Sequence, residues 1–551
     1  MQLIHTTVSP VSQKVLEDGL YLIDFGRAAF GSVELNVRCA AAEGVLTVEL
    51  AEKLTNKGAL DRKPGGTIRY QAIPLKLRQG THLYRVTIPA DERNTGARAI
   101  RMPVEIGEVL PFRYCGIAGL SKGIELLSAT QRFVHSPFND DAAYFECSDP
   151  VLNEVWDLCR HTIKATTFCG LYVDGDRERI PYEGDAYINQ LSHYCLDTSY
   201  GMAQKTIDYL VQHPTWPTEW HLHMPMIAWY DFLYSGDAGR IHAHYDILKL
   251  KTLYGLAGED GLISAKDSPA KTQICKQLGF DGFFAEGLAD MVDWPRNDSG
   301  QGDIQGEADG YVFSPVNTAV NALHHRSLVL MGQIARQLGK VSDVAFFELR
   351  ARQVADSLNR KLFDLSRGIY IDGNTTEHAS QHANFYPLLS GLVSEARLSK
   401  VLSFIRSRGM SCSVYGAQHL LDALYKNGAA EHALALMTAK TDRSWWHMIH
   451  RVGSTMTLEA WDAKYKPNLD WNHAWGAAPT NIIIRRLMGV RPAIPGFGKA
   501  IIQPQLGGLE WAKAKVPTVF GPIEVEVTQE AGREAVVEYK LPDGVARAEV
   551  G

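Results

Sequence analysis

The feature that most constrains this chain is a change in hydrophobic period near residue 148. Before it, short segments such as LYLIDFG, SVELNVRC and THLYRVTIP partly alternate apolar with polar residues, and glycine, proline, asparagine and aspartate separate them. After it, apolar residues recur at helical spacing, beginning with Val151, Val155 and Leu158. A period of two residues indicates strands, and a period near 3.6 indicates helices. The sequence therefore predicts a β-sandwich followed by a large helical domain.

Helical patterns, about a dozen in number, fill residues 148 to 488 and are joined by short, often glycine-containing loops. Short loops favour consecutive antiparallel hairpins. Six hairpins closed into a toroid would use this number, although periodicity does not separate a closed barrel from an open solenoid. Strand-like segments return after VRPAIPGFG. We predict a multidomain α+β protein with a sandwich over 1–143, a helical domain over 144–489 and a β-module over 490–551.

Composition narrows the functional classes. The net charge is −6 and no basic block typical of nucleic-acid binding occurs. No apolar run reaches the roughly 18 residues of a membrane-spanning helix. The start, MQLIHTTVSPVSQKV, lacks the basic and apolar regions of a secretory signal, and the 8 cysteines form no CxxC pair. We expect a cytoplasmic protein that binds neither nucleic acid nor membrane, leaving open that a signal was removed.

The segment VDGDRERIPYEGD (173–185) concentrates charge between apolar flanks. Its charged residues are Asp174, Asp176, Arg177, Glu178, Arg179, Glu183 and Asp185. If the segment is extended, Asp174, Asp176 and Glu178 share one face and the two arginines share the other. Crowding and burial raise a carboxyl pKa, whereas an adjacent arginine lowers it, and acid–base hydrolysis requires two carboxyl groups with different pKa values. The alternative is a buried ion-pair network that braces the next helix.

Tryptophans gather near acids and histidines. Of the 11 in the chain, most lie in predicted loops or helix starts, namely Trp216, Trp220, Trp229, Trp294, Trp445, Trp446, Trp461, Trp471 and Trp475. Indole faces beside carboxylate and imidazole groups suit a sugar ring, which needs an apolar platform and directional polar partners. This pattern favours a carbohydrate site over a purely structural ion-pair network.

Other chemistries find little support. His221 and His223, with Glu219, could ligate a metal, but no further cluster has suitable spacing. A G-x-S-x-G nucleophile turn, a G-x-G-x-x-G turn between strand and helix, and a P-loop are all missing. We therefore expect no metal and no cofactor.

Residues 174–185 resemble the acidic motif of glycoside hydrolase family 78, the α-L-rhamnosidases, which reads D…R-D-E-R-x-G-W-x-G-D. TMTLEAWD (455–462) and WNHAWG (471–476) resemble the second signature of that family. The order of Asp176 and Arg177 is reversed relative to the pattern, and Tyr182 stands where the family has tryptophan. The resemblance covers about residues 145–545 and implies that the helical domain is an (α/α)6 barrel.

The resemblance further implies an inverting hydrolase. Glu178 matches the general acid, which protonates the leaving glycosidic oxygen, and Glu459 matches the general base, which activates water on the opposite face of the sugar. Only a closed barrel would bring these two residues together. The expected substrate-binding residues are Asp174, Arg177, Arg179, Tyr182, Asp185, Trp229, Trp294 and His473.

We expect an exo-acting α-L-rhamnosidase that removes terminal rhamnose from glycosides or oligosaccharides. The alternatives are an (α/α)-barrel glycosidase for another sugar, a catalytically inactive sugar-binding relative, and a polysaccharide lyase. The sandwich would serve as a platform or as a carbohydrate-binding module. The sequence leaves open the aglycone, the linkage, and whether the protein is a monomer or a homodimer.

Overall fold

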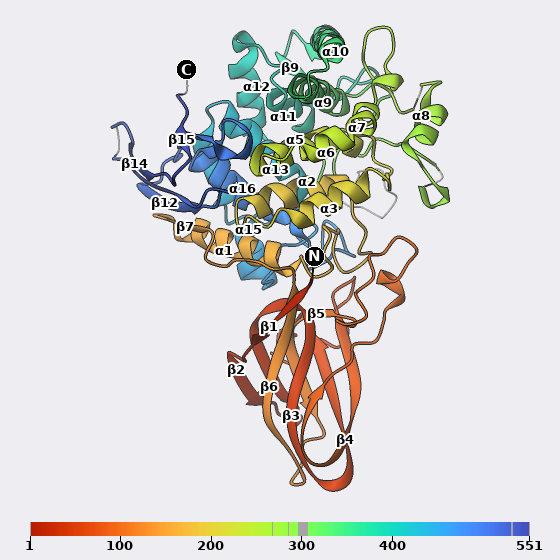
Figure 1. The fold of residues 1–551 in the computed structure, drawn as a ribbon, viewed down its shortest axis with the longest axis vertical. Helices are drawn as coiled ribbons and strands as arrows, with labels where there is room; N and C mark the ends of the chain where they lie inside the picture. Colours follow the sequence, from red (N-terminus) through yellow and green to blue (C-terminus); the bar gives the residue numbers. More distant parts are fainter. Residues whose placement is uncertain (1, 267, 285, 296–306, 531–532, 550–551) are drawn as a thin grey trace.

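The computed structural model describes residues 2–266, 268–284, 286–295, 307–530 and 533–549. The first residue of the predicted sandwich and residues 550–551 of the predicted C-terminal module lie outside these ranges. Figure 1 shows a β domain at one end of the molecule, a helical body above it, and the last strands packed at the side of the helices. The predicted multidomain α+β class is confirmed.

The N-terminal strands form a folded antiparallel sheet with two layers. They are β1 (Ile4–Val8), β2 (Ser12–Val15), β3 (Tyr21–Ala51), β4 (Tyr70–Arg85), β5 (Leu110–Ala118) and β6 (Ile124–His135). The strand β3 runs through both layers, because its residues 31–39 pair with β6 and its residues 47–51 pair with β5. A register shift between Cys39 and Glu43 marks the bend. Alternate residues such as Val33, Leu35 and Val37 are fully buried in the core, as the period of two predicts.

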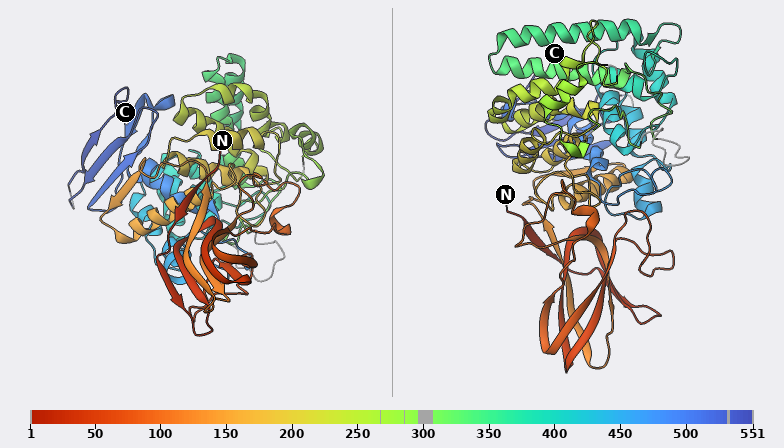
Figure 2. Two further views of the ribbon diagram at one scale, coloured as in Figure 1. Left: turned by 60° about the horizontal axis from the view of Figure 1, so that its bottom comes forward. Right: turned by 90° about the vertical axis from the view of Figure 1, so that its right-hand side faces the viewer.

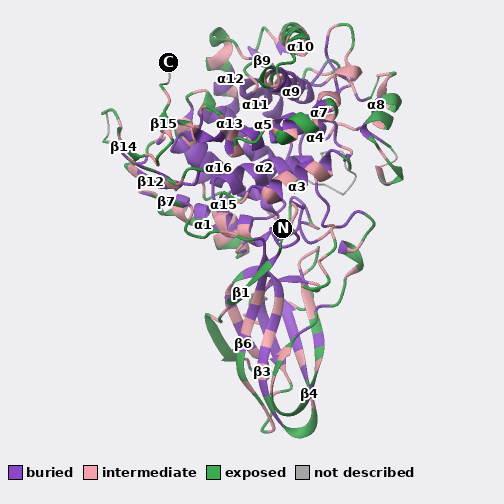
Figure 3. Cartoon of the chain, viewed as in Figure 1, coloured by how far each residue is buried: buried purple, intermediate pink, exposed green. Residues whose placement is uncertain are grey.

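Six helices form a closed ring at the centre of the helical body. They are α2 (Glu183–Tyr194), α5 (His223–Ser235), α9 (Thr318–Gln337), α11 (His382–Leu389), α13 (Val414–Lys426) and α16 (Ala478–Ile482). Each contacts the next in chain order, and α16 contacts α2. Every residue of α2, α11 and α16 is buried, and the buried interior of the body is visible in Figure 3. Helices buried on all sides lie inside a larger helical layer.

The remaining helices cover or connect this ring. They are α1 (Pro150–Ala165), α3 (Gly201–Leu210), α4 (Thr218–His221), α6 (Gly239–Ala243), α7 (Tyr245–Lys251), α8 (Lys271–Leu278), α10 (Val341–Lys361), α12 (Glu395–Ser407), α14 (Ala430–Met437) and α15 (Trp445–His447). The helix α1 begins where the helical period starts, and the Asp149 carboxylate accepts hydrogen bonds from the N–H groups of Val151 and Leu152. Within the described ranges, none of the helices has both the length and the apolar character needed to cross a membrane.

The C-terminal strands form two small sheets. One contains β10 (Val490–Pro492), β11 (Lys499–Ile502) and β15 (Ala546–Arg547); the other contains β12 (Trp511–Val516), β13 (Ile523–Thr528) and β14 (Val536–Lys540). The strand β7 (Tyr144–Cys147) pairs antiparallel with β12. Residues 144–147, which the sequence places at the start of the helical domain, thus complete the C-terminal sheet. A short hairpin, β8 (Phe363–Asp364) and β9 (Ile369–Tyr370), lies between helices α10 and α11 in the chain. Figure 2 shows the N-terminal sandwich, the helical body and the C-terminal strands from two further sides.

Candidate active site

The charged segment before α2 is a closed turn. The Asp174 N–H donates to the Ile180 carbonyl (3.0 Å), and the Ile180 N–H donates to the Asp174 carboxylate (2.9 Å). Between them, Arg179 adopts a left-handed backbone with φ of 55°. Pro181 precedes α2, which begins at Glu183 and has carboxylates in its first turn, where the helix dipole favours them.

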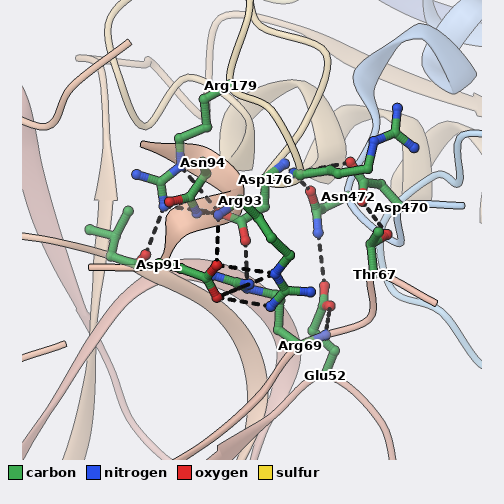
Figure 4. A network of polar contacts seen from close by, with 12 residues as sticks. Glu52, Thr67, Arg69, Asp91, Arg93, Asn94, Asp176, Arg179, Asp470 and Asn472 are labelled. Atoms are coloured by element: carbon green, nitrogen blue, oxygen red, sulfur yellow. Dashed lines mark hydrogen bonds and ion pairs between the residues drawn. The ribbon is translucent and has the colours of Figure 1, made fainter. Parts of the chain in front are cut away.

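This turn contradicts the predicted alternation of faces. Asp174, Arg177 and Glu178 line one cavity, whereas Asp176 and Arg179 meet residues of the N-terminal domain (Figure 4). Alternation requires an extended backbone, and the two hydrogen bonds that close the turn remove it. The segment therefore divides its charges between a cavity and a domain interface.

The cavity has a volume of about 130 Å³. It is lined by Asp174, Arg177, Glu178, Tyr182, Asp185, Trp216, Trp220, Met291, Trp294, Glu459, His473 and Trp475. All the predicted site residues are there except Arg179 and Trp229. The two glutamates, about 280 positions apart in the chain, thus line the same space.

Glu178 is the more accessible of the two glutamates. The Tyr182 hydroxyl donates to its Oε2 (2.9 Å), and the Nε of Arg177 lies 3.3 Å from its Oε1. Its side chain is 37% exposed. A substrate atom can therefore reach this carboxyl group without a rearrangement of the backbone.

Glu459 is buried among cations, with a side chain that is only 1% exposed. Arg177 donates to both of its carboxylate oxygens (2.9 and 3.1 Å), the Asp470 N–H donates to Oε2 (3.0 Å), and the ammonium of Lys466 lies 3.4 Å from Oε1. Burial opposes ionisation, but Arg177 and Lys466 outweigh it and lower the pKa of Glu459 to about 2. Glu459, the predicted general base, is therefore ionised, but both of its carboxylate oxygens already accept hydrogen bonds.

Polar atoms without partners line the same cavity. Among the described residues, neither carboxylate oxygen of Asp185 and only one of Asp174 has a hydrogen-bond partner. Burial, followed by the charge of Glu459, raises the pKa of Asp185 well above its ordinary value. Nδ1 of His473 lies 3.5 Å from Oδ1 of Asp185, and burial lowers the pKa of that imidazole to about 3. Buried polar groups normally have partners, so these atoms are available to a ligand.

Aromatic rings form the rest of the wall. The ring centres of Trp216 and Trp294 are 6.4 Å apart in an edge-to-face contact. The ring centres of Trp220 and Tyr182 are 5.4 Å apart, and those of His473 and Trp475 are 4.4 Å apart. The gathering of tryptophans beside acids had already indicated Trp216, Trp220 and Trp475, although not as individual site residues. Met291 carries no such signal in the sequence.

Two predicted residues lie elsewhere. Arg179 is buried against Asp176 (2.9 Å) and Glu108 (2.5 Å), because the left-handed backbone turns it away from the cavity. Trp229 lies in α5 and packs against Phe232, with 5.7 Å between the ring centres. Its side chain is partly buried against the hydrophobic core of the helical body rather than in the cavity.

The histidines considered as metal ligands bond to the backbone. His221 contacts the Thr215 carbonyl (2.7 Å), and His223 contacts the Glu219 carbonyl (2.8 Å). Across the described ranges, no three histidine, cysteine, aspartate or glutamate side chains are grouped as metal ligands would be.

A larger hollow of about 910 Å³ lies over β12, β13 and β14. Its charged side chains include Lys513 and Glu526, which pair with each other at 2.9 Å. Neither of the predicted catalytic glutamates lines it. The smaller cavity, where unpartnered polar atoms and indoles converge, is therefore the candidate active site.

Comparison with known families places two matches along the chain. The bacterial alpha-L-rhamnosidase 6 hairpin glycosidase domain matches residues 140–487, and the bacterial alpha-L-rhamnosidase C-terminal domain matches residues 489–550. An alpha-L-rhamnosidase of Alteromonas sp. (strain LOR) is 26% identical over 408 residues, which is 70% of this chain and 42% of that protein. The chain spans about half the length of the curated relatives it matches.

Solved structures share the fold. An alpha-L-rhamnosidase from Dictyoglumus thermophilum superposes with a TM-score of 0.76 at 19% identity, covering 98% of this chain and 58% of that one. The alpha-L-rhamnosidase of Streptomyces avermitilis, solved in complex with L-rhamnose, superposes with a TM-score of 0.75 at 17% identity, covering 99% and 50%. At these identities the likeness concerns the fold alone.

Proposed function

Because the chain belongs to the bacterial α-L-rhamnosidases of glycoside hydrolase family 78, we propose that it is an inverting exo-glycosidase that hydrolyses terminal α-L-rhamnose from glycosides or oligosaccharides. One observation carries the proposal: a single guanidinium, that of Arg177, contacts both Glu178 and Glu459 in a cavity walled by indoles. Hydrolysis of a glycosidic bond typically requires two carboxyl groups on either side of that bond, and this cavity supplies two.

Glu178 is the proposed general acid. Its exposure lets it reach the glycosidic oxygen, and the Tyr182 hydroxyl holds one of its oxygens in place (2.9 Å). As the bond from the anomeric carbon to that oxygen breaks, the Glu178 proton passes to the leaving oxygen. General acid–base assistance of this kind contributes about 10²–10⁴-fold to rate.

Glu459 is the proposed general base, which takes the proton of the attacking water. The contact with a shared guanidinium is compatible with the separation of about 6.5–9.5 Å that admits this water. A carboxylate with so low a pKa accepts a proton poorly while its cations stay in place. Lys466 makes the longest of the contacts (3.4 Å), and we propose that the water takes its place at Oε1. Asp185, with two unbonded oxygens, is the competing base.

Asp174, Asp185 and His473 are the proposed partners of the sugar hydroxyls, and Trp294 is a proposed apolar platform. The small volume of the cavity supports one terminal sugar rather than a chain. The structure of the Streptomyces relative with L-rhamnose supports rhamnose as that sugar.

We also propose that the closed ring of helices and its outer layer form an (α/α)6 barrel within the predicted domain 144–489, although the first strand of that range, β7, pairs with the C-terminal sheet. A sandwich over 1–143 precedes this domain and a β-module over 490–551 follows it. The contact of α16 with α2 supports closure, which brings the segments that carry Glu178 and Glu459 together. The cytoplasmic location and the homodimer remain predictions.

Proton NMR of the sugar released from p-nitrophenyl α-L-rhamnoside tests the function and the stereochemistry together. We expect β-rhamnose to appear first, because water attacks opposite the leaving group. Initial α-rhamnose would instead mean a covalent intermediate and would contradict inversion. Faster turnover of another aryl glycoside would favour the alternative sugar, and an unsaturated product that absorbs in the ultraviolet would indicate a lyase.

The same assay assigns the roles of the carboxyl groups. With a rhamnose-terminated oligosaccharide, whose leaving oxygen needs a proton, Glu178→Gln should lower turnover by orders of magnitude while L-rhamnose still binds, which separates an enzyme from an inactive sugar-binding relative. Azide is a nucleophile that needs no deprotonation, so it should restore turnover to Glu459→Ala with an inverted glycosyl azide as product. Rescue of Asp185→Ala instead would transfer the role of base to Asp185.

A further inference from the structure

The N-terminal sandwich presents a polar face to the candidate site. It precedes both matched family domains, the first of which begins at residue 140. Figure 4 shows Glu52, Thr67, Arg69 and Asn94 of the sandwich directed at Asp176, Asp470 and Asn472. We propose that the sandwich is a positioning element of the active site, which holds the Glu178 turn through Asp176 and the Glu459 segment through Asp470 and Asn472. The proposal rests on the proposed function.

Asp176 is the first point of attachment. Its Oδ2 lies 2.6 Å from the Nε of Arg69, and its Oδ1 accepts hydrogen bonds from Asn94 (3.1 Å) and from Arg179 (2.9 Å). All four side chains are buried. A carboxylate held from three sides in a buried place fixes the backbone that carries it, and Glu178 lies two residues further along the chain.

Asn472 is the second point of attachment, and it ties two distant segments to the sandwich. Its Oδ1 accepts the N–H of Asp176 (2.9 Å), and its Nδ2 donates to Glu52 (3.0 Å). The second oxygen of Glu52 accepts the N–H of Arg69 (2.7 Å). Since His473 follows Asn472 directly, this bridge also places one wall of the cavity.

Asp470 is the third point of attachment, and it leads straight to the proposed base. The Thr67 hydroxyl contacts its carboxylate, whose other oxygen accepts the N–H of Arg177 (3.2 Å). The Asp470 N–H donates to Oε2 of Glu459 (3.0 Å). Thr67 is thus connected to Glu459 through one intervening residue.

This arrangement predicts a larger effect on kcat than on KM. The bridges hold the turn that carries Glu178 and residues 470–472, of which Asp470 bonds to Glu459. Two of the proposed sugar contacts, Asp174 and His473, lie in or beside these held segments, whereas Asp185 and Trp216 belong to α2 and to the loop before α4. A misplacement of about 1 Å at reacting groups can lower the rate about 100-fold.

A matched pair of substitutions, one in β3 and one directly after it, tests the proposal. Glu52→Met removes both acceptors of the bridge, while Glu49→Met removes an equally buried carboxylate that bonds only within the sandwich, to Arg62 and Tyr70. Methionine is used because burial raises the pKa of Glu52 to about 8, so that glutamine would imitate the protonated side chain. Thr67→Val, which keeps the shape of the side chain, serves if Glu52→Met does not fold.

The measurements are kcat, KM, the unfolding temperature and amide hydrogen exchange in 174–180 and 468–473. Loss of outer-shell support typically costs about 10–100-fold, so we expect Glu52→Met to lower kcat by that factor with a smaller change in KM. Exchange should rise in both segments. Glu49→Met should lower the unfolding temperature with kcat unchanged.

The proposal is overturned if both variants lower kcat equally, if Glu52→Met affects only the unfolding temperature, or if exchange rises in the two segments while kcat stays the same. A rise in KM alone would make the sandwich a carbohydrate-binding module instead. Absence of turnover in the unmodified protein would defeat the proposed function. Hydrogen exchange needs no substrate and would still decide whether the sandwich holds the two segments.

Discussion

At the scale of single residues, Arg177 controls the ionisation of the carboxyl groups in the candidate site. Its guanidinium is shared between Glu178 and Glu459, and its contact with Glu459 is bidentate. Such forked pairs fix both charge and orientation. Because the folded-state pKa of Glu459, about 2, lies below its ordinary value of 4.5, this pair stabilises the fold above pH 4.5. That contribution is lost as the pH falls from 4.5 towards 2.

Arg177→Met should therefore change the pH profile as well as the rate. Without the guanidinium, burial dominates and the pKa of Glu459 rises, so a base that was ionised throughout the working range becomes protonated in mild acid. We expect an acidic limb of kcat/KM to appear above pH 4 in this variant, whereas the unmodified protein, in which the pKa of Glu459 is about 2, should show none in that range. The measurement is kcat/KM from pH 4 to pH 9.

Arg177→Lys is the control for this prediction. It keeps the positive charge but loses the forked geometry. This variant, like the unmodified protein, should show no acidic limb above pH 4, while its kcat falls. Profiles of the same shape in all three proteins would show that Glu459 does not act as the base.

At the scale of secondary-structure elements, the contact between α2 and α4 positions an aromatic wall of the cavity. Gly184 lies in the first turn of α2, and a Cβ atom built there would lie 2.6 Å from the Trp220 indole. Real Cβ atoms do not approach other atoms so closely. Only glycine lets the indole of α4 pack against the start of α2, beside Glu183 and Asp185.

Gly184→Ala should displace Trp220 and distort the cavity. Overpacking of this kind costs about 1–3 kcal/mol of stability, and we expect weaker binding of L-rhamnose with a blue or red shift of tryptophan fluorescence. The measurements are titration calorimetry and fluorescence emission.

Gly332→Ala in α9 is the matched control, because its nearest neighbour, the Cβ of Phe347, lies at an ordinary 3.5 Å. An alanine in the middle of that helix should stabilise the protein by about 0.5–1 kcal/mol without affecting the sugar. Equal effects of both substitutions on binding would contradict a specific role for the α2–α4 contact.

At the scale of the whole molecule, parts far apart in the sequence depend on one another. The C-terminal module is joined to the helices by β7 on β12 and by the backbone around Gly489. Gly489 has a φ of 69°, and a Cβ atom there would lie 1.9 Å from the Gln503 carbonyl oxygen. The junction therefore requires glycine for its conformation and for its close backbone contact.

Gly489→Ala should loosen the C-terminal module. The strained backbone costs about 1–3 kcal/mol, and the clash with Gln503 adds to it. We expect a lower unfolding temperature and faster proteolysis after residue 489. Gly508→Ala is the control, since its φ of 109° imposes strain but nothing lies within 4 Å of its Cβ position. If both variants unfold alike, the contact with Gln503 contributes nothing.

Much of the fold could be predicted because it depends on local pattern. Alternation in Val33, Leu35 and Val37 indicates a strand with one buried face, and the helical spacing that starts at Val151 indicates where α1 begins. The acidic motif and the tryptophans likewise pointed to the residues that line the cavity. These signals act within a few residues, so the linear sequence contains them in full.

The sequence by itself determined the division into strands and helices, the family, and the types of residue in the cavity. Only the tertiary structure decided that Arg179 faces the sandwich, that Trp229 packs away from the cavity, and that Glu459 is bonded to Lys466 as well as to Arg177. The physical reason is the distance along the chain between the residues that interact. Burial and charge pairing depend on contacts between distant segments, such as the hydrogen bond from Asn472 to Glu52 across 420 positions, and no local pattern specifies the partner.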